Sequence, residues 1–147
     1  MKVFLDTNVL VSGFATRGLC ADVIRLVLAE HELITADVVL NELKRVLKHK
    51  IQLPGEQIQE ILAFLESQTV QPKPRSLSSI SVRDEDDQWV LASALAAKAD
   101  VFVTGDKDLL DVANEVSALT ITDPRGFWNL VKKRPRSKRT SRSVRSS

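Results

Sequence analysis

Four acidic side chains lie where the sequence pattern predicts the functional edge of an α/β sheet. Asp6 comes directly after the first apolar run of the chain, and Asp106 follows the run Val101–Thr104 after a single glycine. Glu42 and Asp87 belong to two predicted helices that should pack near the same edge. Because functional groups in open parallel sheets collect beyond the carboxyl ends of the strands, we expect these four carboxylates to converge.

Converging carboxylates limit the chemistry that such an edge can perform. Like charges within about 4–6 Å raise each other's pKa and cost stability, and a divalent cation reverses that cost. A set of ligands made only of oxygen atoms favours Mg²⁺ or Mn²⁺. One or two such ions can activate water and stabilise the leaving oxygen of a phosphodiester. The acids therefore predict a Mg²⁺ or Mn²⁺ centre suited to phosphodiester hydrolysis.

Each of these acids also has a purely structural interpretation. Asp6 would close the first strand at a polar turn, and Glu42 would lie on the solvated face of its helix. Acids in the first turn of a helix oppose the helix dipole, which would account for three neighbours, Asp84, Asp86 and Asp87. Turn formation and capping of a short helix would account for two more, Asp106 and Asp108. Spacing along the chain leaves both interpretations open.

Strands and helices alternate along the chain, which indicates an α/β fold. Short strands are predicted at Lys2–Leu5, Glu32–Thr35, around Val70, Val101–Thr104 and Leu119–Ile121. Helices are predicted at Cys20–Glu30, from Thr35 or Asp37 to about His49, after Pro54, at Asp87–Ala99, around Leu109–Ala113 and at Arg125–Lys132. Thr7-Asn8 is predicted to be a turn, and residues 71–81 a loop. The order predicts a three-layer sandwich with a short, mostly parallel central sheet.

Charge divides the chain into an acidic body and a basic end. Residues 132–147 contain eight Lys or Arg and no acid, which leaves 13 basic and 19 acidic residues in 1–131, a net charge of −6. We expect residues 1–131 to form one domain and residues 132–147 a disordered tail, because the tail has too little apolar surface to fold alone. Cys20 is the only cysteine, which excludes an intrachain disulfide and favours the cytoplasm. No stretch approaches the roughly 20 apolar residues that span a membrane.

Five segments in order resemble one known family, the PIN-domain ribonucleases. They are residues 3–13 (VFLDTNVLVSG), 39–47 (VLNELKRVL), 83–91 (RDEDDQWVL), 99–110 (ADVFVTGDKDLL) and 121–127 (ITDPRGF). The branch they resemble most contains the toxin components of toxin–antitoxin systems, which are called VapC-like. The resemblance runs from Lys2 to about Leu130, and the ordered set is far more specific than any single motif.

The resemblance implies roles for individual residues. Its catalytic acids fall on Asp6, Glu42, Asp87 and Asp106, and Asp6, Asp87 and Asp106 are the expected metal ligands. The third acid could be Asp84, Asp86 or Asp87, and Asp87 is preferred because it heads the helix that leads into Val101–Thr104. Four residues are expected to assist, namely Asp84, Asp108, Asn8 and Thr104, the last two by orienting metal-bound water or carboxylates.

The resemblance also implies an activity and partners. These are hydrolysis of single-stranded RNA by metal-activated water, a homodimer, and inhibition by an antitoxin protein. One alternative is a haloacid-dehalogenase-like phosphatase, which needs a second aspartate where this chain has Asn8. Another is a module of the same fold that binds RNA or a protein partner without catalysis. The presence of all four acids argues against the second alternative.

The basic tail generates a prediction of its own. Lys and Arg side chains that contact phosphates add affinity that falls with salt and does not depend on sequence. Deleting residues 133–147 should therefore weaken binding to single-stranded RNA and flatten its dependence on salt, as measured by fluorescence anisotropy at several salt concentrations. Identical binding curves for the full and shortened chains would show that the tail does not contact RNA.

Overall fold

Five parallel strands form one sheet in the order β3-β2-β1-β4-β5 in the computed structural model, which describes residues 1–133. The strands are β1 (Lys2–Leu5), β2 (Glu32–Ala36), β3 (Thr69–Gln71), β4 (Val101–Val103) and β5 (Thr120–Thr122). Every neighbouring pair in this sheet is parallel. The predicted α/β class with a short parallel sheet is therefore confirmed, and β1 occupies its centre.

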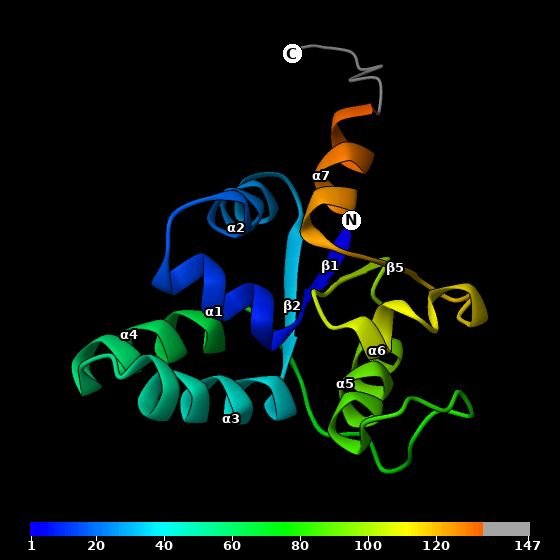
Figure 1. The fold of residues 1–147 in the computed structure, drawn as a ribbon, viewed down its shortest axis with the longest axis horizontal. Coiled ribbons are helices and arrows are strands. Elements are labelled where there is room, and N and C mark those ends of the chain that lie inside the picture. Colours follow the sequence, from blue (N-terminus) through cyan, green and yellow to red (C-terminus); the bar gives the residue numbers. More distant parts are fainter. Residues whose placement is uncertain (134–147) are drawn as a thin grey trace.

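Helices cover both faces of the sheet, as Figure 1 shows. They are α1 (Thr7–Ala15), α2 (Leu19–Glu30), α3 (Asp37–Val46), α4 (Gly55–Glu66), α5 (Glu85–Ala96), α6 (Lys107–Leu110) and α7 (Pro124–Lys133). A π-helical segment, η1 (Leu47–Ile51), extends α3, and a 3₁₀ turn, η2 (Ala113–Glu115), follows α6. Helices α1 to α4 lie on one side of the sheet, and α5 and α6 lie on the other. The result is a three-layer sandwich.

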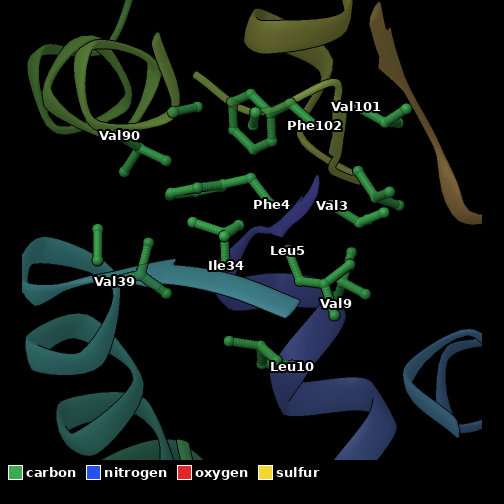
Figure 2. Close-up of a cluster of buried hydrophobic side chains, with 14 of the residues drawn as sticks. Val3, Phe4, Leu5, Val9, Leu10, Ile34, Val39, Val90, Val101 and Phe102 are labelled. Carbon is green, nitrogen blue, oxygen red and sulfur yellow. The ribbon is translucent and has the colours of Figure 1, made fainter. Parts of the chain in front are cut away.

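The core is built on the central strands. Phe4 of β1 and Phe102 of β4 are paired in register, and their rings meet edge to face with centroids 5.2 Å apart. Figure 2 shows both rings on the side that faces Val90 of α5, whereas Leu5 points toward α1 on the opposite side. Burial of such side chains drives folding, and aromatic pairs in this geometry add to it. The packing therefore fixes β1 against β4, the two strands that carry Asp6 and Asp106 at their ends.

The predicted Thr7-Asn8 turn is wrong, because these residues begin α1. Asp6 is its N-cap, and its side chain accepts a hydrogen bond from the Thr7 backbone N–H. Aspartate is among the most favourable residues at this position. Val9 and Leu10 are buried in the first turns of the helix, so the chain passes from strand to helix without a loop.

Two further helix boundaries differ from the prediction. Helix α5 begins at Glu85 and ends at Ala96, because Asp84 caps its start and Lys98 adopts a left-handed conformation (φ 56°) beyond its end. Helix α6 begins at Lys107 because Asp106 caps it through the Asp108 backbone N–H. Both boundaries place an aspartate at the N-cap, where it is held by the helix it starts.

The described part of the chain ends with α7. Residues 134–147, which contain most of the predicted basic tail, lie outside the described residues. Within residues 1–133, no helix has the length and apolar character that crossing a membrane requires.

Candidate metal centre

Asp6 is a buried carboxylate at the junction of β1 and α1, with 3% of its surface exposed. Its Oδ1 accepts a hydrogen bond of 2.7 Å from the Thr7 backbone N–H. Its Oδ2 accepts hydrogen bonds from the Thr104 hydroxyl (2.7 Å) and the Asn8 amide (3.3 Å). Both oxygens are thus held in place by groups from the ends of two neighbouring strands.

Burial raises the pKa of Asp6 to about 6, although the hydrogen bonds from Thr104 and Thr7 oppose the shift. The negative charges of Glu42 and Asp106 add to it. Both residues must therefore lie close enough to Asp6 to repel it. The interpretation of Asp6 as a turn residue is wrong, because Asp6 caps α1. Capping alone does not explain why a charge is buried among other acids.

Thr104 and Asn8 connect the first strand to the turn after β4. The Thr104 hydroxyl donates to Asp6 and accepts a hydrogen bond of 3.0 Å from the Asp106 backbone N–H. The Asn8 side-chain oxygen accepts a hydrogen bond of 2.8 Å from the Gly105 backbone N–H. These contacts fix where Asp106 lies relative to Asp6. The structure therefore places Asn8 and Thr104 where they orient carboxylates, as one of their two expected roles requires.

Glu42 reaches the same region from α3, on the other side of Asp6. Its Oε1 accepts a hydrogen bond of 2.9 Å from the Thr7 hydroxyl, and the side chain is half-buried. The interpretation of Glu42 as a solvated residue is therefore wrong. Sequence reasoning gave Thr7 only a local role, and nothing in its spacing signals that its hydroxyl joins Glu42 to the residue after Asp6.

Asp87, Asp106 and Asp108 form the tightest acidic group of the described residues. Each offers one carboxylate oxygen, and these oxygens lie within 4.8 Å of one another. Asp87 comes from the first turn of α5, whereas Asp106 and Asp108 begin α6. The expected metal ligands were Asp6, Asp87 and Asp106, whereas this group contains Asp108 in place of Asp6. Asp6 is linked to the group through Thr104, whose hydroxyl donates to Asp6 and accepts a hydrogen bond from the Asp106 backbone N–H.

Asp87 is the most perturbed acid of the group. Burial raises its pKa to about 8, and the adjacent Asp106 contributes further to the shift, with smaller effects from Asp6 and Asp84. Its Oδ2 is buried and has no hydrogen-bond partner among the described residues. A buried carboxylate oxygen without a partner is costly, so the geometry leaves Asp87 in need of a proton or a cation.

Asp84 and Asp86 are placed outside this group. Asp84 Oδ1 accepts hydrogen bonds from the backbone N–H groups of Asp86 and Asp87, at 2.8 and 3.4 Å. The structure thus assigns the capping role to Asp84. Asp86 is exposed and lines a pocket between α3 and α5.

The residues at this edge fit a divalent cation. Within residues 1–133, no lysine or arginine forms an ion pair with Asp6, Glu42, Asp87, Asp106 or Asp108. Among the described residues, hydrogen bonds offset part of their mutual repulsion, but no side-chain cation neutralises these carboxylates. Mg²⁺ and Mn²⁺ accept carboxylate oxygens together with water, and the unpartnered Asp87 Oδ2 offers such an oxygen.

A parallel α/β fold with acids grouped beyond β1 and β4 is the arrangement of a PIN domain. The family model described as the PIN domain matches residues 2–108, which is most of the chain. The chain therefore belongs to the PIN-domain family, and the alternative of a haloacid-dehalogenase-like phosphatase is set aside. None of the curated protein sequences matches this chain.

Solved structures of VapC toxins and VapBC complexes share this fold. VapBC-1 from nontypeable Haemophilus influenzae has a TM-score of 0.58 and 19% identity, and the match covers 85% of this chain and 99% of that one. VapBC2 from Rickettsia felis, bound to a DNA fragment from its promoter, has a TM-score of 0.57 and 19% identity over 84% and 98% of the two chains. VapC20 from Mycobacterium tuberculosis, a sarcin-ricin loop cleaving toxin, has a TM-score of 0.56 and 15% identity over 75% and 94%.

The raised pKa values predict how the stability of the metal-free protein depends on pH. Asp6 and Asp87 have folded-state pKa values of about 6 and about 8, both above the ordinary aspartate value of 3.8. Between the ordinary pKa of 3.8 and the raised folded-state values, the folded state binds more protons than the unfolded state. The free energy of unfolding therefore falls as pH rises through this range. Thermal melts in EDTA should therefore show the melting temperature falling from pH 5 toward pH 8, over the range of these pKa values.

Asp87→Asn provides the matched control, because it keeps the shape of the side chain and removes its charge. The variant should lose the part of the decline that lies above the Asp6 pKa of about 6. A melting temperature that rises steadily over the same pH range in wild-type protein would contradict the burial of these charges.

Proposed function

We propose that this protein is a cytoplasmic, metal-dependent ribonuclease that hydrolyses single-stranded RNA by means of metal-activated water. The observation that carries the proposal is the grouping of Asp87, Asp106 and Asp108 within 4.8 Å, beside the buried Asp6. Membership of the PIN-domain family supports it. Asp87 lies far along the chain from Asp106 and Asp108, and only Asp106 of the three is a helix cap, so capping does not explain the group.

In this proposal Asp6, Asp87 and Asp106 hold Mg²⁺ or Mn²⁺, and Asp108 contributes a further carboxylate. The chemistry supplied by the bound ion is the activation of water and the stabilisation of the leaving oxygen of the phosphodiester. The protein holds its acids in place beforehand. Thr104 and Asn8 orient Asp6, and Thr7 fixes one oxygen of the fourth catalytic acid, Glu42.

We further propose that the protein is the toxin of a toxin–antitoxin pair and works as a homodimer. The support is the common fold with VapC20 and with the VapBC structures, in which the toxin is present with its antitoxin. The surface offers apolar area for a protein partner. Phe64 of α4 and Ile51 of η1 each expose 39% of their surface.

The competing hypothesis is a PIN-domain protein that binds RNA or a partner without catalysis. It accounts for the fold equally well. It does not account for the buried and unpartnered oxygen of Asp87, which would only reduce stability in a protein that never binds a cation.

Asp6→Asn tests the proposed function most simply. The change keeps the size of the side chain and removes the buried charge, so RNA cleavage in Mg²⁺ or Mn²⁺ should fall by about two orders of magnitude, the upper range for loss of a group that supports a metal site. The melting temperature in EDTA should rise, because the cost of burying the charge disappears. Release of fragments from labelled single-stranded RNA is the measurement.

Asp84→Asn is the matched control for this prediction. Asparagine caps helices about as well as aspartate, so the variant should keep wild-type activity if Asp84 only caps α5. EDTA should abolish cleavage by both the wild type and this control. Wild-type rates in purified Asp6→Asn protein would rule out the catalytic assignment.

A further inference from the structure

A pocket of about 180 Å³ lies next to the acidic group, between α3, the segment after β3, and α5. The residues that matter to its chemistry are Asn41, Glu42 and Arg45 of α3, Lys73 after β3, and Asp86 and Trp89 of α5. Its cationic and aromatic side chains, Arg45, Lys73 and Trp89, do not belong to the candidate metal centre. The lining therefore combines two cations, two carboxylates, an amide and an indole ring in one hollow.

The pocket is continuous with the candidate metal centre. Glu42 lines the pocket and also accepts the hydrogen bond from Thr7 beside Asp6. Asp86, on the opposite wall, directly precedes Asp87 of the acidic group. A polymer that crosses the acidic group would therefore pass beside this pocket.

The ring of Trp89 gives the pocket a surface on which a base can stack. Trp89 is half-buried, and the Lys73 ammonium lies 4.3 Å from the centroid of its ring. Aromatic side chains bind the flat faces of unpaired bases, and neighbouring cations bind the phosphates of the strand. The Asn41 amide can both donate and accept hydrogen bonds at a base edge.

The charge of this pocket is balanced, with Arg45 and Lys73 matched by Glu42 and Asp86, whereas the body of the protein is acidic. Residues 1–131 carry a net charge of −6, which repels RNA. Arg45 and Lys73 place positive charge on the wall of a hollow that adjoins the most acidic part of the molecule. An attractive site at this position would guide an anionic strand toward carboxylates that repel it.

We propose that this pocket is a nucleotide-binding subsite for single-stranded RNA, which rests on the proposed ribonuclease function. One unpaired base stacks on Trp89, and Arg45 and Lys73 contact the phosphates that flank it. Because the Lys73 ammonium now lies over the ring, the base takes its place and the flexible lysine side chain turns toward a phosphate. The subsite selects single strands, because a base inside a duplex cannot leave its stack without cost.

Tryptophan fluorescence tests the stacking contact directly. Trp89 and Trp128 are the two tryptophans of the chain, so Trp128→Phe leaves Trp89 as the only indole fluorophore. In an Asp6→Asn/Trp128→Phe background, single-stranded oligoadenylate should quench this fluorescence in a saturable manner. An RNA duplex at equal concentration should quench it far less. Unchanged emission while labelled oligoadenylate binds, as shown by anisotropy, would overturn the proposal.

Steady-state cleavage of RNA separates binding from catalysis. Trp89→Leu should raise KM at least about five-fold and change kcat little, the lower end of what loss of one stacked base costs. Trp89→Phe should restore most of the loss, because it keeps an aromatic face. If Trp89 has only a packing role, Trp89→Phe should restore the stability lost in Trp89→Leu, and the KM values of the two variants should be the same. Equal KM values for wild type and a folded Trp89→Leu variant would contradict the subsite.

Arg45→Ala tests the phosphate contact, and Lys44→Ala is its control. Both residues are exposed on α3, but only Arg45 lines the pocket. Arg45→Ala should reduce the slope of log affinity against log salt by about 0.7, the value for one phosphate contact on a single strand. Lys44→Ala should leave the slope nearly unchanged. Equal slopes for Arg45→Ala and wild type would overturn the contact.

The two proposals fail in different ways. Quenching of Trp89 by RNA without any cleavage by wild-type protein would remove the ribonuclease function and leave the subsite in place. Cleavage without quenching, and with KM unaffected by Trp89→Leu, would keep the ribonuclease and remove the subsite.

Discussion

The repulsion among carboxylates at the ends of β1 and β4 is the constraint on which the rest of the structure depends. Asp6 is buried, and Asp87 carries an oxygen with no partner among the described residues. Both arrangements cost folding free energy. The fold tolerates that cost because parallel strands, an aromatic core and three helix caps hold the acids together. A divalent cation would turn this local instability into a binding site.

The supporting contacts are concentrated in a few polar side chains. Thr104 joins Asp6 to the backbone of Asp106, and Asn8 joins α1 to Gly105. The aspartates that start α5 and α6 serve the backbone as caps and also set the direction in which the helices leave the sheet. Local structure and the candidate site therefore depend on the same residues. Asp6 and Asp106 can each cap a helix and also belong to the candidate metal site.

Sequence patterns predicted the layers of the fold because the buried strands are short apolar runs and the helices repeat with a clear period. They missed α1, because the polar pair Thr7-Asn8 resembles a turn and the residues that follow alternate only weakly between an apolar and a polar helix face. They placed the start of α5 too late, because three aspartates in four residues are equivalent as caps until the backbone is known. Asp84 proved to be the cap.

The candidate site was predictable in outline but not in detail. Strand order accounts for Asp6 and Asp106, because the carboxyl ends of the neighbouring strands β1 and β4 lie at one edge of the sheet. The inclusion of Asp108 depends on how tightly α6 turns after Asp106, and the position of Glu42 depends on a hydrogen bond from Thr7. The pocket around Trp89 depends on the path of the loop after β3, for which the sequence carries no periodic signal.

Binding of Mn²⁺ in crystals of the protein is the most direct measurement of the central claim. Anomalous diffraction should place a Mn²⁺ ion among the carboxylates of Asp87, Asp106 and Asp108, next to Asp6. An ion at any other position, or full binding of RNA and substrate turnover with no ion among these four residues, would contradict the account.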